Sequence, residues 1–297
     1  MHASNTLMRF LKSGLVAIAA LVLTACSSLQ LAYNYAPGLI AYRMNTYLNL
    51  DEKQQALLDQ ELATFAAWHD ETLPRYTAAL NQWATRLSNP APFSSGEILG
   101  IQETIEQQLQ SVGARAAIQL APLLVTLGPQ QLKQLQSKFK DSNTEYVSDY
   151  LENPDRPANI KKRHARITKR FESWLGTLSP QQRNILISVS DQRAPIIAAW
   201  FEERKLRQQA LIQLIESQQS APPSQAQDAL EDYLKSLNRY REPMLNAQRD
   251  SLRLDWAQAT AEILNIASPE QKKFLQNKLR GYAQDFAALT SKKVAQN

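Results

Sequence analysis

The chain has 297 residues, of which 44% are apolar, and its 33 Lys and Arg residues against 28 Asp and Glu residues give a formal net charge of +5. This apolar content is enough for a buried core and excludes a disordered chain. Eight glycines are few against a usual ~7%, which argues against an all-β fold and against glycine-rich phosphate loops. One Cys and three His exclude a disulfide framework and a Cys-rich zinc site.

Residues 1–25 have the pattern of a secretory signal peptide. Arg9 and Lys12 form a short basic region, and the apolar run that follows is too short for a membrane span, which needs ~20 residues. The run ends in Leu23-Thr24-Ala25-Cys26, which resembles the lipobox of bacterial lipoproteins. This resemblance implies cleavage before Cys26, a diacylglycerol thioether on its sulfur, and an acyl chain such as palmitate on its amino group. The alternative is an ordinary secreted protein with a chance cysteine.

Cleavage before Cys26 would leave a mature chain of residues 26–297. Because Arg9 and Lys12 are removed, its net charge falls to +3, and this mild charge predicts no nucleic-acid partner. Ser27 is a non-acidic residue after the lipidated cysteine. By resemblance to lipoprotein sorting rules, it implies a lipid-anchored protein on the periplasmic face of the outer membrane, with the membrane itself as a partner.

Segment 26–50, directly after the expected anchor, is rich in tyrosine. It contains four of the ten tyrosines, at Tyr33, Tyr35, Tyr42 and Tyr47. Tyrosine is favoured at membrane interfaces, but its amphipathic ring is equally suited to burial against a helical bundle. Both interpretations stay open at this point, and the short linker from Cys26 predicts a domain that sits close to its membrane.

Residues 51–88 show the clearest helical period. A stripe of mostly apolar residues spaced three or four apart starts at Leu58, includes His69 and ends at Leu87. The stripe keeps its phase across Pro74. The pattern therefore predicts one long helix that is kinked at this proline, instead of two separate helices.

The densest group of unusual residues surrounds Pro74. It consists of Trp68, His69, Arg75 and Tyr76. One hypothesis is an interaction groove at the helix kink, in which Arg75 binds an anion. The other is that the proline bends the helix around the bundle and the aromatic side chains fill the bend.

The spacing of apolar residues predicts helices in the rest of the chain as well. No stretch of five or more residues shows the alternation of apolar and polar residues that is typical of a strand. We expect a single all-α domain over residues 51–297, folded as an elongated bundle of about eight or nine helices. Ser94 or Ser95 is expected to cap the second of them. The helices after the first are expected at 98–124, 132–150, 160–178, 180–191, 194–218, 224–241, 243–266 and 269–290.

A basic stretch lies in the helix expected at 160–178 and just before it. Besides Arg156, it contains six candidate contacts for an anionic surface, which are Lys161, Lys162, Arg163, Arg166, Lys169 and Arg170. Ile160, His164 and Ile167 take one face of this helix and leave the charges on the others. The stretch fits either binding to anionic lipid, lipopolysaccharide or peptidoglycan, or an ordinary solvated helix face.

One short motif occurs four times. It combines an apolar residue, a capping residue, usually a proline, and a glutamine at the fifth position, in the order of a helix start with a capping box. The unequal spacing between copies excludes a solenoid repeat. The copies are Leu50-Asp51-Glu52-Lys53-Gln54, Leu127-Gly128-Pro129-Gln130-Gln131, Leu178-Ser179-Pro180-Gln181-Gln182 and Ala267-Ser268-Pro269-Glu270-Gln271.

Two resemblances follow from these residues. The four motifs look like the LTxxQ motifs of Spy- and CpxP-type periplasmic chaperones, which implies a helical, client-binding protein. A broader likeness covers nearly the whole mature chain and resembles an uncharacterised family of helical bacterial lipoproteins, a domain of unknown function. It rests on the lipobox, the glutamine motifs, and on Tyr33-Asn34, Tyr47-Leu48-Asn49-Leu50, Trp68-His69, Leu73-Pro74-Arg75-Tyr76, Trp174-Leu175-Gly176-Thr177-Leu178, Arg204 and Arg207-Gln208.

No pattern for catalysis stands out. The sequence contains no H-E-x-x-H, no Glu-x-x-His and no G-x-S-x-G, so we expect no catalytic residues, no metal and no cofactor. We therefore expect a non-enzymatic binding or scaffold module of the cell envelope, with an envelope protein or peptidoglycan as its partner. The alternatives are a chaperone-like client binder and an envelope enzyme that acts on peptidoglycan or lipid.

Overall fold

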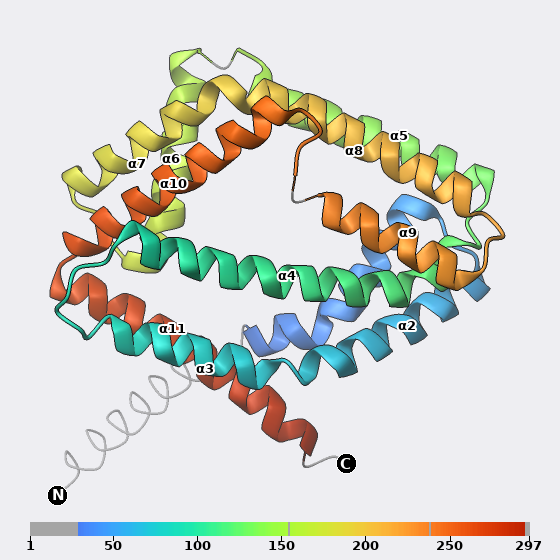
Figure 1. Ribbon diagram of the computed structural model, residues 1–297, viewed down its shortest axis with the longest axis horizontal. Helices are drawn as coiled ribbons and strands as arrows, with labels where there is room; N and C mark the ends of the chain where they lie inside the picture. The colour runs from blue at the N-terminus through green and yellow to red at the C-terminus, as the bar shows by residue number, and fades with distance from the viewer. Residues whose placement is uncertain (1–28, 154, 238, 295–297) are drawn as a thin grey trace, which may run out of the picture.

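The computed structural model describes residues 29–153, 155–237 and 239–294, and these fold into helices without a strand (Figure 1). The expected signal peptide 1–25 and Cys26 lie outside the described residues. The expectation of an all-α fold is confirmed. The α-helices are 29–48, α2 (Glu52–Asp70), α3 (Leu73–Arg86), α4 (Ser95–Leu124), α5 (Pro129–Tyr146), α6 (Pro157–Leu175), α7 (Pro180–Arg193), α8 (Ile197–Gln218), α9 (Pro223–Ser236), α10 (Pro243–Asn265) and α11 (Pro269–Val294).

The expected number of eight or nine helices was slightly too low, because the described residues contain eleven α-helices. One of the additional helices is the tyrosine-rich segment, which is helical over 29–48. The other arises where the single long helix expected over 51–88 divides into α2 and α3.

The division between α2 and α3 has a clear physical cause. Pro74 takes the second position of α3, within the first helical turn, where its missing N–H leaves no hydrogen bond unmade. Glu71 and Thr72 form a two-residue turn, and the Thr72 hydroxyl donates to the His69 carbonyl at 2.6 Å. Both residues keep nearly helical dihedral angles, so the apolar stripe stays in phase although the helix ends.

The helices follow a closed outline that α4 crosses (Figure 1). Residues far apart in the sequence meet along it, since α11 packs along α3, and α4 packs against α2, α9 and α10. One apolar core includes Leu186 and Ile263, which are fully buried, and draws on α3, α4, α6, α7, α10 and α11. A second core includes Ala117 and Ile215 and draws on helix 29–48, α4, α5, α8 and α9. Because α4 contributes to both cores, it joins the two halves of the molecule.

The four glutamine motifs start helices as expected, and the structure adds that they meet in two pairs. Gln54 at the start of α2 and Gln131 at the start of α5 exchange amide hydrogen bonds of 3.1 and 2.6 Å. Gln182 at the start of α7 and Gln271 at the start of α11 do the same at 3.0 and 2.9 Å. The same motif therefore links two helix starts in each half of the fold.

Each of these glutamine side chains also forms two hydrogen bonds with main-chain groups, one at its own helix start and one in another segment of the chain. In the second pair, the Gln182 Oε1 atom accepts from the Ser179 N–H at 2.9 Å and its amide group donates to the Ile263 carbonyl at 3.4 Å. The Gln271 amide group donates to the Thr177 carbonyl at 2.7 Å. A buried amide must have partners to be tolerated, and here one carboxamide provides the helix cap and the link to the other helix.

Candidate functional site

The predicted cluster around Pro74 forms a polar network with the tyrosine-rich helix. The Tyr33 hydroxyl lies 2.8 Å from Nδ1 of His69 and donates to the Asp70 carboxylate at 2.9 Å. On the other side of the ring, the Tyr76 hydroxyl lies 3.4 Å from Nε2 of His69. Phe65 stacks on His69, and Trp68 packs edge-on against it. Three of the four predicted residues are thus brought together, with Tyr33 added from a different helix.

The hydrogen bonds of Tyr33 indicate which His69 nitrogen carries a proton. The single Tyr33 proton goes to Asp70, so Nδ1 of His69 donates to the Tyr33 oxygen. In the neutral imidazole that burial favours, Nε2 then accepts from the Tyr76 hydroxyl. Burial lowers the pKa of His69, although the nearby Asp70 carboxylate opposes the shift. Burial and the bond to Asp70 raise the pKa of Tyr33, so its hydroxyl stays protonated.

The fourth predicted residue, Arg75, does not join the network. Its side chain is exposed, and it forms no hydrogen bond or ion pair with the described part of the chain. The Arg115 guanidinium instead lies 5.7 Å from the centre of the Trp68 ring. This arrangement favours the interpretation in which the aromatic residues fill the bend and attach helix 29–48 to α2 and α3.

The neutral state of His69 predicts a pH dependence of stability. The unfolded-state pKa is ~6.5 and the folded-state pKa is lower, so the unfolded chain binds the proton first as pH falls. We expect the urea midpoint to decrease below about pH 6.5, where His69→Gln should show a shallower decrease. Equal pH slopes for the two proteins would contradict this role of His69.

The basic stretch lies on α6 with most of its charges in solvent. Lys161, Lys162, Arg166, Lys169 and Arg170 are exposed. Arg163 pairs with Asp191 of α7 at 2.7 Å, and His164 lies 2.8 Å from the same carboxylate. Burial raises the pKa of Asp191, but the hydrogen bonds from Arg163 and His164 outweigh it and leave this pKa below its usual value. Of the six candidate contacts, one cation therefore joins α6 to α7 and five are exposed to solvent.

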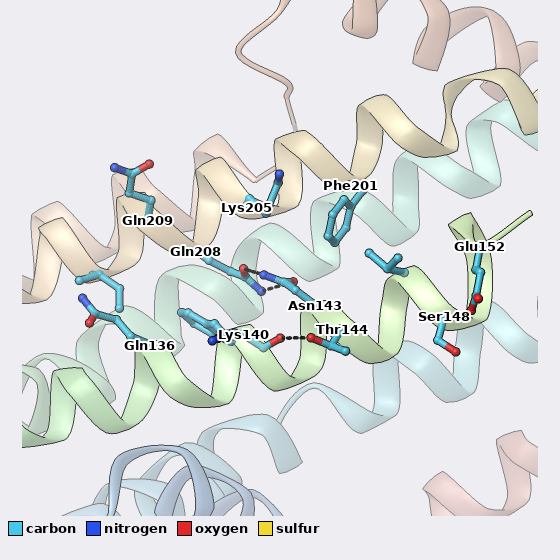
Figure 2. A pocket seen from close by; sticks show the side chains of 13 residues that line it. Gln136, Lys140, Asn143, Thr144, Ser148, Glu152, Phe201, Lys205, Gln208 and Gln209 are labelled. Atoms are coloured by element: carbon cyan, nitrogen blue, oxygen red, sulfur yellow. Dashed lines mark hydrogen bonds between the residues drawn. The ribbon is translucent and has the colours of Figure 1, made fainter.

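A groove of about 720 Å³ lies between α5 and α8 (Figure 2). Its volume is within the range of ~300–1,000 Å³ that is typical of ligand sites. Apolar side chains line it at Phe139, Val147, Phe201 and Ile212. Its polar lining comes from amides, amines, hydroxyls and one carboxylate, with Gln136 and Gln209 toward one end and Ser148 and Glu152 toward the other (Figure 2).

An amide pair bridges the two walls of this groove. Asn143 donates to Oε1 of Gln208 at 2.7 Å, and Gln208 donates to Oδ1 of Asn143 at 3.2 Å (Figure 2). Arg204 fixes the pair because it donates to Asn143 at 2.9 Å and to Ser142 at 2.7 Å. These side chains are occupied with one another, so the groups left for a ligand are those at the rim, such as Gln136, Lys140 and Gln209.

Residues 46–243 match a family described as Family of unknown function (DUF6279). The chain belongs to this family. No curated protein and no solved structure matches the chain. The expected membership of an uncharacterised family is confirmed, and the DUF6279 region contains the whole α5–α8 groove and three of the four paired glutamines.

Among the residues that the structure describes, no helix is both long and apolar enough to cross a membrane. Within the same residues of this DUF6279 protein, no three His, Cys, Asp or Glu side chains are grouped so that they would hold a metal ion.

The sequence interpretation missed the groove because its residues look ordinary. Asn143 and Gln136 read as the polar face of an amphipathic helix, and nothing in a single sequence shows that Gln208 faces them. One signal was present, since Arg204 and Arg207-Gln208 carried part of the family resemblance. In the structure Arg204 donates a hydrogen bond to Asn143 of the groove lining, whereas Arg207 pairs with the buried Glu203 at 3.2 Å.

Proposed function

We propose that this protein is a lipid-anchored, non-enzymatic binding module on the periplasmic face of the outer membrane, and that the α5–α8 groove binds an extended segment of an envelope protein. The observation that carries the proposal is the groove itself. It combines an apolar lining with rim amides at Gln136 and Gln209, which suit the donors and acceptors of an extended backbone. The amine of Lys140 adds a preference for a segment with acidic residues.

The N-terminal helix supports attachment to a membrane. Its side chains at Leu31, Tyr35, Leu39 and Tyr42 are 52%, 67%, 62% and 73% exposed. Their spacing of four, four and three residues places them on one face of the helix. Tyr33 and Tyr47 instead turn inward, to His69 and Phe139. An exposed aromatic and aliphatic stripe that begins five residues after Cys26 fits the interface of the membrane that would hold the anchor.

This orientation predicts membrane affinity without the lipid. The full chain carrying Cys26→Ser is expected to bind phospholipid vesicles weakly, and adding Tyr35→Glu with Leu39→Glu should reduce this binding roughly tenfold. Vesicle flotation measures it. The matched control is Met244→Glu with Leu254→Glu, which charges two exposed apolar residues of α10. A control that loses as much binding as the stripe variant would contradict the orientation.

Site-specific photo-crosslinking in cells tests the proposed groove. A photoreactive residue at position 136 or 209 is expected to form an adduct with one or a few envelope proteins. The same residue at position 60, an exposed glutamine of α2, should form none of these adducts. Replacing Lys140 with glutamate should reduce the adduct at position 136. Equal adducts at positions 60 and 136 would refute the groove as the binding surface.

The crosslinking pattern also separates the alternatives. Adducts of similar yield with many unrelated envelope proteins would favour the chaperone-like client binder that the glutamine motifs suggested. Absence of protein adducts, together with turnover of peptidoglycan or lipid by the purified protein, would favour an envelope enzyme.

A further inference from the structure

A second cavity, of about 710 Å³, lies in the other half of the molecule, between α3, α4, α6, α10 and α11. Its walls are predominantly apolar, and its volume is again that of a ligand site. Aromatic and aliphatic side chains dominate the lining, among them Trp83, Ile101, Phe171, Trp174, Leu264 and Leu279. Such a surface favours a flexible hydrocarbon over a polar ligand.

Gly100 lies in one wall of this cavity. It lies within the 30-residue helix α4, on the same face as Glu97, Ile101 and Thr104, which also line the cavity. A Cβ atom added at Gly100 would meet no atom within 4 Å. A side chain larger than alanine at this position therefore has room to extend over the cavity lining, so Gly100 is a position at which a substitution can fill the cavity.

The charge at the rim is positive. Arg86 and Glu97 both line the cavity, but they neutralise each other through two hydrogen bonds of 2.6 and 2.9 Å. Arg170 of α6 also lines the cavity. Its exposed guanidinium makes no ion pair or hydrogen bond with the residues that the structure describes. An uncompensated cation beside an apolar cavity is complementary to an amphiphile with an anionic head group.

The cavity also lies near the start of the described chain. Leu275 and Leu279 of α11 line it, and six residues further along α11, or about 9 Å, Asp285 accepts a hydrogen bond from Gln30 at 2.9 Å. Gln30 is only four residues after Cys26. This step rests on the proposed anchor, which would hold the cavity close to a lipid surface.

We infer that this cavity binds one acyl chain of an anionic amphiphile, either a fatty acid or a phospholipid. The hydrocarbon tail would lie against the apolar walls beside Gly100, and the carboxylate or phosphate would pair with Arg170 at the rim. This cavity and the α5–α8 groove share no lining residue, so an experiment can refute one proposed site without refuting the other.

Direct binding of palmitate and of the uncharged alcohol of the same length tests this inference. The probe protein is the full chain with Cys26→Ser, so that no covalent lipid competes. Palmitate is expected to bind at least tenfold more tightly than the alcohol. Gly100→Leu should weaken palmitate binding about tenfold or more, whereas Gly281→Leu should leave it within about twofold. Gly281 is the matched control because it also lies inside a helix, and an added Cβ there also meets nothing within 4 Å.

Charge reversals on α6 test the role of the Arg170 guanidinium in binding the anionic head group. Arg170→Glu is expected to abolish the preference for palmitate over the alcohol, and Lys161→Glu, an exposed charge reversal on the same helix, should keep it. Melting temperatures of all variants confirm folding. Mass spectrometry of lipid extracted from the purified chain distinguishes a bound phospholipid from a fatty acid. No palmitate binding by the parent chain, or equal binding by the Gly100→Leu and Gly281→Leu chains, would overturn the inference.

Discussion

Replacing Gln182 with alanine is expected to lower the free energy of unfolding by about 3 kcal/mol. Gln182 is fully buried, and the substitution removes its bonds to the Ser179 N–H, to the Ile263 carbonyl and to the Gln271 amide. The substitution leaves these partners without their hydrogen bonds, and each unsatisfied buried group costs roughly 1–3 kcal/mol. Urea denaturation followed by circular dichroism measures the change.

Gln181→Ala provides the control for this prediction. Gln181 is the neighbouring residue with the same side chain, but it is exposed, so its removal should change stability by less than about 0.5 kcal/mol. A double-mutant cycle between Gln182 and Gln271 should give a coupling energy of about 1 kcal/mol or more. Equal destabilisation by the two single changes, or additive effects in the cycle, would show that the amide pair does not link α7 to α11.

Arg86→Ala is expected to destabilise the protein by about 2 kcal/mol. The Arg86 guanidinium binds both Glu97 oxygens, donates to the carbonyls of Ala91 and Pro92 at 3.1 Å, and lies 4.0 Å from the centre of the Phe93 ring. It therefore holds the loop between α3 and α4 in place. The estimate is modest because Arg86 and Glu97 are still 23% and 31% exposed.

The comparison for Arg86 is Arg75→Ala on the same helix. Arg75 is exposed, so its removal should leave the melting temperature within about 1 °C of the parent. Arg86→Lys should recover only part of the loss, because an amine cannot make the paired contacts of a guanidinium. Full recovery by lysine, or a large loss from Arg75→Ala, would contradict the roles that the structure gives to these arginines.

Local chemistry explains why the helix starts were predictable. The residues of a capping box are adjacent in sequence, so the starts of α2, α5, α7 and α11 follow from the motifs alone. The pairing of those starts was not predictable, because it depends on which helices meet in space. The break between α2 and α3 was missed for a related reason. A two-residue turn with nearly helical dihedral angles preserves the apolar period on which the prediction depended.

The candidate sites depended still more on tertiary structure. The sequence treated Tyr33 and Tyr35 alike, and only the structure separates them: Tyr33 turns inward to His69, whereas Tyr35 is exposed. Trp83 and Phe171 are partly buried and pack against the first apolar core, but they also line a cavity. A single sequence shows which residues form the apolar stripe of a helix. It does not show where the stripes of two facing helices leave a cavity between them.

Thiol labelling in cells tests most directly whether the α5–α8 groove is a binding surface that is occupied by a partner. The chain has one cysteine, which the proposed lipid would block, so Gln136→Cys would carry the only reactive thiol in the groove and Gln60→Cys the matching one on α2. We predict that maleimide labels position 136 at least about tenfold more slowly in intact envelopes than in the purified protein, while position 60 reacts equally in both. Equal labelling of position 136 in envelopes and in solution would contradict the account.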